Sequence, residues 1–355
     1  MRALVVVCRY LGDVLLATPL AKSLEESGYE VDWLVAPGTG AIIEGQSFAK
    51  HIYSLETDIH SVCQTTRKLW KKYDIACVLT GSDRPMLVSL AAAKKTYALL
   101  PTRNQDAWKR MMSSSWFGYD PEAHVVNYAL KLQEMAGLTP HRDVGIKWSV
   151  SDLNSLTNTL KWDINTPYIH LHPFARWPYK LWSDEKWQQL IRAIHNEGMN
   201  IVITAAPGEQ VLAENIARVI PEDSIQVFAG EFNWRQLAAL SAHAKLYVGL
   251  DTANTHLAAS TGVSTIAIFG PTNPQIWGPW VNGFEGSSPY QPSSTNGVQT
   301  VDNIMLVQGS QDCVPCQLEG CEKHRQSYSA CLDSLEFERI WNLVKNHMDG
   351  VTPNE

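Results

Sequence analysis

The sequence predicts an α/β protein built from two doubly wound parallel sheets. Short apolar runs rich in β-branched residues alternate with helical segments, first over residues 3–80 and again over residues 167–271. This alternation is typical of strands joined by crossover helices, which cover both faces of a parallel sheet. A chain of 355 residues is also long enough for two hydrophobic cores of ordinary size.

The first series predicts a strand at 3–8, a helix at about 14–27 that Gly28 ends, a strand at 30–37, a helix at 62–72 and a strand at 74–80. The second predicts strands at 167–173, 200–207, 225–230, 245–250 and 264–271, with helices between them. A polar stretch at 148–166 is the expected linker. An irregular region at 281–331 precedes a last helix at about 335–347.

Composition and charge exclude several classes of protein. Apolar residues make up 45% of the chain and charged residues 18%, as in globular proteins, and no apolar run approaches the roughly 20 residues that span a bilayer. The N-terminal run resembles a first strand more than a secretory signal, so we expect a cytoplasmic protein. The net charge of −7 provides no basic face for nucleic acid.

Basic pairs occur mainly in the first half of the chain, where residues 1–150 contain 17 Lys and Arg against 15 Asp and Glu. Two interpretations remain open for these pairs: solvated helix faces, or contact with an anionic acceptor or a membrane surface. The pairs are Arg67-Lys68, Lys71-Lys72, Lys94-Lys95 and Lys109-Arg110.

A polar hexapeptide, Asp251-Thr252-Ala253-Asn254-Thr255-His256, follows the apolar run at 245–250 and precedes a helical stretch. This order predicts a strand-to-helix turn. Thr252 or Asn254 is suited to cap the helix, whose free N–H groups favour an anion such as a diphosphate. An ordinary capped turn with no ligand is the alternative.

Two further loops follow predicted strands, where open α/β sheets bind their ligands. In the first, Gly12 allows a tight turn and Asp13 places a carboxylate at a helix start, where it is suited to act as a general base. In the second, Arg176 and Lys180 supply two cations suited to a diphosphate. Ordinary capping and surface charge remain the alternatives for both loops.

Motifs of several other enzyme classes are absent from the sequence. It contains no G-x-x-x-x-G-K-[ST], G-x-G-x-x-G, H-E-x-x-H or G-x-S-x-G pattern. P-loop hydrolysis, hydride transfer, zinc-protease and serine-hydrolase chemistry are therefore disfavoured.

The motifs R-Y-L-G-D-V-L-L-A-T-P (9–19), K-L-W-S (180–183) and G-L-D-T-A-N-T-H-L-A-A with F-G-P-T (249–259 and 269–272) resemble glycosyltransferase family 9, the ADP-heptose:lipopolysaccharide heptosyltransferases. The W-G-P-W run and the A-R-W-P-Y-K-L-W loop are most similar to the heptosyltransferase III type. The resemblance implies the GT-B fold, two Rossmann-like domains facing a cleft. Residues 1–155 would bind the acceptor and residues 160–335 the nucleotide sugar, and a helix in 336–355 would cross back to the first domain.

The resemblance also implies a role for individual residues. Asp13 is similar to the catalytic base of the family, and Lys180 to the cation on the donor diphosphate. Glu209 would bind the ribose and Phe232 would pack on adenine. The remaining donor-binding residues that it implies are Gly12, Arg176, Asp251, Thr252, Ala253 and His256. This sequence departs from other members at Ala175 and Arg176, where Thr or Ser is frequent, and at Ala253, where Gly occurs.

Four cysteines, Cys313, Cys316, Cys321 and Cys331, lie in one polar loop with the spacing C-x2-C-x4-C-x9-C. Four thiolates can complete a tetrahedral metal site, so we expect a structural zinc or iron, with free thiols as the alternative. Some members of the resembled family have a similar pattern, and those that glycosylate autotransporter proteins bind iron with it. The resemblance implies that catalysis itself needs no cofactor.

The resemblance predicts an inverting glycosyltransferase that moves heptose from ADP-heptose to the inner-core oligosaccharide of lipopolysaccharide. Its partners would be the ADP-sugar donor and the lipopolysaccharide core, with no nucleic acid. It would lie in the cytoplasm, with peripheral contact at the inner membrane. The alternatives are a heptosyltransferase for protein hydroxyls, a nucleotide-sugar epimerase of the same fold and a sugar-nucleotide binding module.

Overall fold

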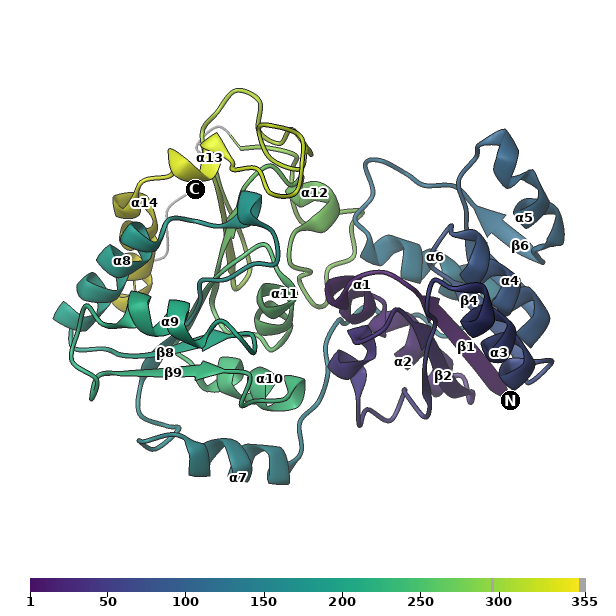
Figure 1. Ribbon diagram of the computed structural model, residues 1–355, viewed down its shortest axis with the longest axis horizontal. Coiled ribbons are helices and arrows are strands. Elements are labelled where there is room, and N and C mark those ends of the chain that lie inside the picture. Colours follow the sequence, from purple (N-terminus) through teal and green to yellow (C-terminus); the bar gives the residue numbers. More distant parts are fainter. Residues whose placement is uncertain (295–296, 351–355) are drawn as a thin grey trace. The chain divides into compact units, whose positions relative to one another are not determined.

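In this computed structural model, which describes residues 1–294 and 297–350, the chain divides into two compact α/β units (Figure 1). The first unit contains Met1–Lys147 together with Asn282–Ser287. The second contains Trp148–Val281 and the described residues from Ser288 onward. Each unit has its own predominantly parallel sheet, which confirms the predicted α/β class.

The sheet of the first unit has six parallel strands in the order β3-β2-β1-β4-β5-β6. This is the doubly wound order in which the sheet grows outward in both directions from β1. The elements of this unit are β1 (Arg2–Val7), α1 (Leu11–Leu16), α2 (Thr18–Glu26), β2 (Glu30–Val35), η1 (Thr39–Ile43), β3 (Ile52–Ser54), α3 (Ile59–Leu69), β4 (Tyr73–Val78), α4 (Asp83–Ala92), β5 (Ala93–Leu99), η2 (Asn104–Asp106), α5 (Ala107–Met112), β6 (Ser115–Phe117) and α6 (Val126–Ala136).

The sheet of the second unit has the order β12-β13-β11-β10-β7-β8-β9, with β12 antiparallel at one edge. Without β12, it repeats the strand order of the first sheet. The elements are α7 (Val150–Thr159), β7 (Tyr168–His172), η3 (Pro178–Lys180), α8 (Asp184–Asn196), β8 (Asn200–Ala205), α9 (Gln210–Ala217), β9 (Ile225–Ala229), α10 (Trp234–His243), β10 (Leu246–Leu250), α11 (Ala253–Ser260), β11 (Thr265–Phe269), α12 (Pro274–Trp277), β12 (Val298–Val301), β13 (Ile304–Gln308), α13 (Ala330–Asp333) and α14 (Phe337–Met348).

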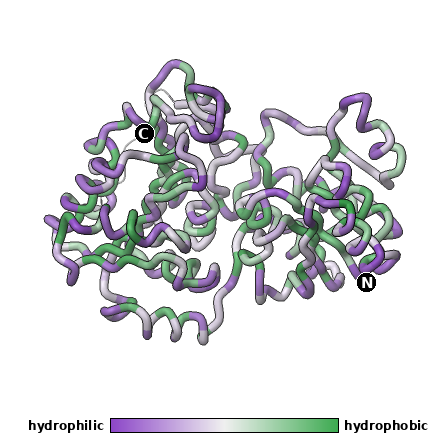
Figure 2. The backbone as a smooth tube through the Cα atoms, viewed as in Figure 1, coloured by the Kyte–Doolittle hydropathy of each residue, from purple (hydrophilic) through white to green (hydrophobic). Residues whose placement is uncertain are grey.

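The strands form the cores of both units, and Figure 2 shows their hydrophobic residues in green. In β7, Ile169 and Leu171 join a core with α8, α9 and α14, while Tyr168 on the opposite face joins a core with α7, α10 and α11. The sheet is therefore buried on both faces, as parallel sheets with crossover helices are. No helix in the described part of the chain is both long and apolar enough to cross a bilayer.

The expected linker at 148–166 contains a helix. Ser149 caps α7 by accepting a hydrogen bond from the Asp152 N–H at 3.1 Å, and the Asp152 carboxylate binds back to the Ser149 N–H at 2.9 Å. Arg235 on α10 pairs with Asp152 at 2.9 Å. Burial alone would raise the pKa of Asp152, but Arg235 and Ser149 outweigh it and lower that pKa to about 2. The polar composition of this stretch therefore reflects caps and ion pairs.

Three other expectations are corrected by the structure. The helix expected at 14–27 is divided into α1 and α2, because Pro19 lies in the first turn of α2. The region at 281–331 contains β12 and β13. The last helix, expected to cross back to the first domain, is α14, and it packs in the second unit, where Ile340, Leu343 and Val344 join the core beside α8.

Candidate active site

Three polar side chains meet at the carboxyl edge of the second sheet. Lys180, in the loop after β7, places its Nζ 2.6 Å from the Oδ2 of Asp251, which directly follows β10. The Thr272 hydroxyl, after β11, donates to the same carboxylate oxygen at 2.6 Å. Because β7, β10 and β11 are neighbours in the sheet, their C-terminal loops converge at its topological switch point.

Asp251 is buried and remains ionised. Burial raises its pKa, but the Lys180 ammonium and the hydrogen bonds from Lys180 and Thr272 outweigh burial and lower the pKa below the usual value. Asp251 in turn holds Lys180, whose side chain is 22% exposed, at the solvent-facing side of the pair. The result is a cation fixed in direction and still accessible to an anionic ligand.

The start of α11 adds polar atoms that have no partner in the described structure. Thr252 occupies the N-cap position, but its hydroxyl makes no cap hydrogen bond, and its Oγ1 is buried without a hydrogen-bond partner among the described residues. One turn later, the Nδ1 of buried His256 also has no hydrogen-bond partner among the described residues. Buried polar atoms without partners are uncommon, so these two indicate a site that a ligand completes. Ala253 lies between them as the first residue of α11.

Three buried histidines near this edge stay neutral. Burial is the main cause and lowers the pKa of His256 to about 4, that of His170 to about 3 and that of His172 to about 4. At neutral pH each ring therefore has one N–H donor and one acceptor nitrogen. A neutral His256 can bind an anionic or hydroxyl ligand without a desolvated charge of its own.

These pKa values predict that the second unit loses stability as the pH falls. Between pH 6.5 and about pH 4, these histidines are protonated in the unfolded chain and neutral in the folded one. As the pH falls through this range, the free energy of unfolding therefore decreases by about 1.4 kcal/mol per pH unit for each histidine. Chemical denaturation between pH 7 and pH 5 measures this slope. His256→Asn should reduce the slope that the three buried histidines produce by about one third. A slope insensitive to His256→Asn would contradict the assignment.

The other donor residues predicted in this unit lie in loops at the same edge of the sheet. Glu209 follows β8, and its Oε2 accepts the Ala206 N–H at 2.7 Å. Phe232 follows β9 and packs against Phe228 with ring centroids 4.6 Å apart. The Arg176 guanidinium lies 4.9 Å from the centre of the Trp177 ring. Among the predicted residues, side-chain hydrogen bonding joins Lys180 directly to Asp251.

In the first unit, Asp13 lies in the first turn of α1, just after β1. Its carboxylate accepts the Tyr10 N–H at 3.2 Å and lies 3.7 Å from Nη1 of Arg9. It is thus positioned at the carboxyl edge of the first sheet. Gly12 is the second residue of α1, so the tight turn expected of it is made earlier in the chain.

Sequence reasoning missed several residues of the site. Thr272 belongs to the quoted F-G-P-T motif, but nothing in that motif indicates a bond to Asp251. Buried His172 contacts the Asn254 side chain at 2.9 Å, and Thr204 joins His172 to His170. The alternation of histidines in Y-I-H-L-H was the available signal, because it places both rings on one face of β7.

The expected metal site at Cys313, Cys316, Cys321 and Cys331 is not assembled in the structure. All four thiols are free, and within residues 1–294 and 297–350 none belongs to a group of three potential ligand atoms that lie within 4.8 Å of one another. Burial, followed by the neighbouring Cys316, raises the pKa of Cys331 to about 12. The loop instead contacts the active-site loops, where Gln317 N–H donates to Pro271 and Ser329 to the Tyr179 carbonyl.

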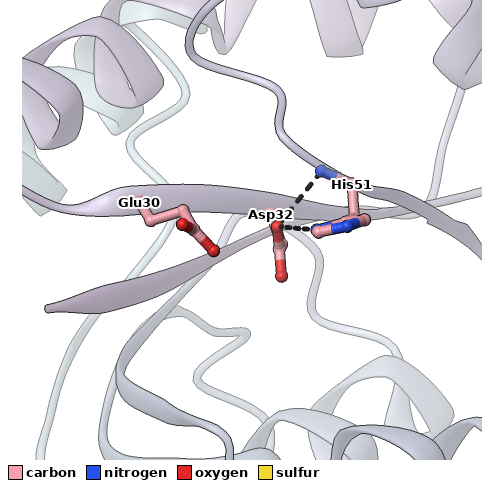
Figure 3. Close-up of side chains that lie close together, drawn as sticks. All are labelled: Glu30, Asp32 and His51. Atoms are coloured by element: carbon pink, nitrogen blue, oxygen red, sulfur yellow. Dashed lines mark hydrogen bonds and ion pairs between the residues drawn. The ribbon is translucent and has the colours of Figure 1, made fainter.

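A different group of potential ligands, Glu30, Asp32 and His51, lies at the amino edge of the first sheet (Figure 3). Asp32 is fully buried, and its carboxylate is already bonded to Arg2 at 2.7 Å, to the Tyr73 hydroxyl at 2.7 Å and to His51 at 3.1 Å. The Arg2 cation thus takes the place that a metal would need. This cluster is a structural network that joins β1, β2 and β4.

Comparison with known proteins identifies the family. Residues 62–301 match the family model "Glycosyltransferase family 9 (heptosyltransferase)". Lipopolysaccharide heptosyltransferase 3 of Escherichia coli strain K12 is 27% identical over 290 residues, which cover 77% of this chain and 83% of that protein.

Solved structures agree on the fold. The E. coli ADP-heptose lipopolysaccharide heptosyltransferase II superposes with a TM-score of 0.74 at 16% identity, covering 99% of both chains. The E. coli heptosyltransferase WaaC with ADP superposes with a TM-score of 0.71 at 17% identity, covering 98% of this chain and 100% of that one. The predicted GT-B fold is confirmed. The family model covers well over half of the chain, and the chain therefore belongs to glycosyltransferase family 9, as a glycosyltransferase.

Proposed function

We propose that this enzyme transfers heptose from ADP-heptose to the inner-core oligosaccharide of lipopolysaccharide, with inversion at the anomeric carbon. The observation that carries the proposal is the cluster of Lys180, Asp251 and Thr272 beside the unpaired Thr252 and His256. A fixed cation and the N-terminus of α11 are suited to a diphosphate leaving group. The relatives' names, lipopolysaccharide heptosyltransferases, support the choice of sugar and acceptor.

The proposed reaction is a single displacement. Asp13 takes the proton of the acceptor hydroxyl while the hydroxyl oxygen bonds to the anomeric carbon from the face opposite the diphosphate. The bond between that carbon and the diphosphate oxygen breaks, and ADP leaves with the electron pair. Lys180 and the first turn of α11 stabilise the charge that develops on the diphosphate. Glu209 holds the ribose of the donor, and Phe232 packs on its adenine. Arg176, Gly12 and Ala253 belong to the loops that bind the donor.

Two rival functions differ in what they need besides the donor. A heptosyltransferase for protein hydroxyls was favoured mainly by the cysteine cluster, which the structure does not assemble into a ligand set. A nucleotide-sugar epimerase would need no acceptor. The test is ADP release from ADP-heptose, with and without a heptose-deficient lipopolysaccharide core. Release that depends on the core supports the proposal, whereas release that depends on protein, or sugar conversion without ADP release, would overturn it.

We further propose that the first unit contacts the inner membrane at the cytoplasmic face through the surface of α5 and β6. Met111 and Met112 end α5 with exposed fractions of 86% and 59%, and Trp116 on β6 is also exposed. The Arg110 guanidinium lies 5.4 Å from the centre of the Trp116 ring, and exposed Arg103 precedes α5. Residues 59–117 contain ten Lys and Arg against three Asp and Glu. Exposed apolar side chains beside cations fit an anionic lipid surface.

Flotation with phosphatidylcholine vesicles, with and without phosphatidylglycerol, tests this surface. We expect the protein to float only with anionic vesicles, and Met111→Ser/Met112→Ser to weaken binding by about tenfold, because two apolar side chains no longer insert. The matched control is Val211→Ser/Leu212→Ser, a pair of exposed apolar residues on α9 in the second unit. Equal loss in both double variants, or no binding by the unmodified protein, would contradict the proposal.

A further inference from the structure

A chain of hydrogen bonds lies on one face of the second sheet and connects α10 with the start of α11. His172 Nε2 lies 2.9 Å from the Asn254 amide nitrogen, and His172 Nδ1 lies 3.0 Å from the Thr204 hydroxyl. That hydroxyl lies 2.8 Å from His170 Nε2, and His170 Nδ1 lies 3.1 Å from the Ser241 hydroxyl. The chain joins α10, β7, β8 and α11, and the Tyr247 ring meets the His170 ring edge-on with centroids 5.0 Å apart.

The chain has one direction. The Asn254 amide nitrogen can only donate, so His172 Nε2 must accept and His172 Nδ1 must carry the proton. His172 then donates to Thr204, which donates to His170 Nε2, and His170 Nδ1–H donates to Ser241. Both rings must be neutral for this arrangement, and burial keeps them so, with pKa values of about 4 for His172 and about 3 for His170.

The direction determines what Asn254 presents to a ligand. Asn254 is the second residue of α11, between the unpaired Thr252 hydroxyl and His256, and it is partly exposed. One amide N–H is used by His172, and the other N–H has no hydrogen-bond partner among the described residues. A His172 ring protonated at Nε2 would instead donate to the Asn254 carbonyl oxygen, and the amide would have the opposite orientation.

We propose that Asn254 is a further donor-binding residue, whose free amide N–H binds a diphosphate oxygen of the nucleotide sugar. We also infer that His172, Thr204 and His170 are positioning residues that fix this amide. The inference rests on the proposed nucleotide-sugar site. It adds Asn254 to that site and adds three buried residues that hold the Asn254 amide in place. Preorganisation of this kind raises affinity because the amide loses less rotamer freedom on binding.

ADP affinity, measured by calorimetry, tests the inference. Asn254→Ala removes one hydrogen bond to a charged group and should weaken ADP binding by about tenfold. Thr204→Val keeps the shape of the strand residue but interrupts the chain, and should weaken binding by about threefold. The matched control is Thr265→Val, because Thr265 is also a fully buried strand threonine whose hydroxyl is bonded, to Val263 at 3.0 Å.

The double variant separates positioning from general stability. If Thr204 acts through Asn254, Asn254→Ala/Thr204→Val should bind ADP no more weakly than Asn254→Ala alone. His172→Gln, whose side-chain oxygen can accept from Asn254, should retain more ADP affinity than His172→Leu. Additive losses in the double variant, or unchanged affinity in Asn254→Ala, would overturn the inference. Failure of the unmodified enzyme to bind ADP would instead overturn the proposed function.

Discussion

Asp13→Asn should reduce turnover by about 10²–10⁴-fold, because the variant cannot accept the proton of the acceptor hydroxyl. Asparagine keeps a side-chain oxygen for the Tyr10 N–H, so α1 should remain capped. Affinity for ADP should change by less than about twofold, since all the proposed donor residues except Gly12 lie in the second unit. Steady-state kinetics with saturating acceptor and calorimetry with ADP measure the two quantities.

The matched control for Asp13→Asn is Asp58→Asn. Asp58 is also an acid at a helix start in the first unit, where it caps α3 by accepting the Ser61 N–H at 2.9 Å. Its substitution should leave turnover unchanged. If Asp13→Asn retained most of the activity, Asp13 would be a capping residue and the base would have to be sought elsewhere.

Lys180→Met should have the second large effect. Loss of the cation that faces the diphosphate should lower turnover by about 10²–10³-fold. It also leaves the buried Asp251 carboxylate without its charge partner, which should cost about 2 kcal/mol of stability, below the range for a fully buried pair because Lys180 is 22% exposed. Kinetics and chemical denaturation of the purified variant measure both effects.

The double variant Lys180→Met/Asp251→Asn distinguishes the two consequences. It removes both charges, so the stability lost in Lys180→Met should largely return while turnover stays low. Recovery of turnover in the double variant would show that Lys180 serves only to neutralise Asp251. Full activity of Lys180→Met alone would contradict its role at the diphosphate.

Much of the fold could be predicted from the sequence, because apolar strands alternate with amphipathic helices and each ends at a recognisable turn. Short edge strands such as β3 and β6, with three residues each, were missed because so few residues show no periodicity. The helix α7 was mistaken for a linker because its polar residues, including Asp152, are satisfied by partners far away in sequence, such as Arg235.

The site was predictable only in part. Residues in the loops that follow strands, such as Lys180 and Asp251, could be found because the carboxyl edge of the sheet is a known place for ligands. Thr272 and the chain from His170 to Asn254 could not, since their roles depend on which strands become neighbours. For the cysteines, spacing indicates that four thiols can meet, but among the described residues no three of their sulfur atoms lie within 4.8 Å of one another.

The most direct test of the account is the mass of a defined lipopolysaccharide core after incubation with ADP-heptose and the enzyme. The account predicts that the acceptor gains the mass of a single heptose, with one ADP released for each sugar transferred. It also predicts no gain with Asp13→Asn over the same time. An acceptor of unchanged mass despite ADP release, or equal transfer by Asp13→Asn, would contradict it.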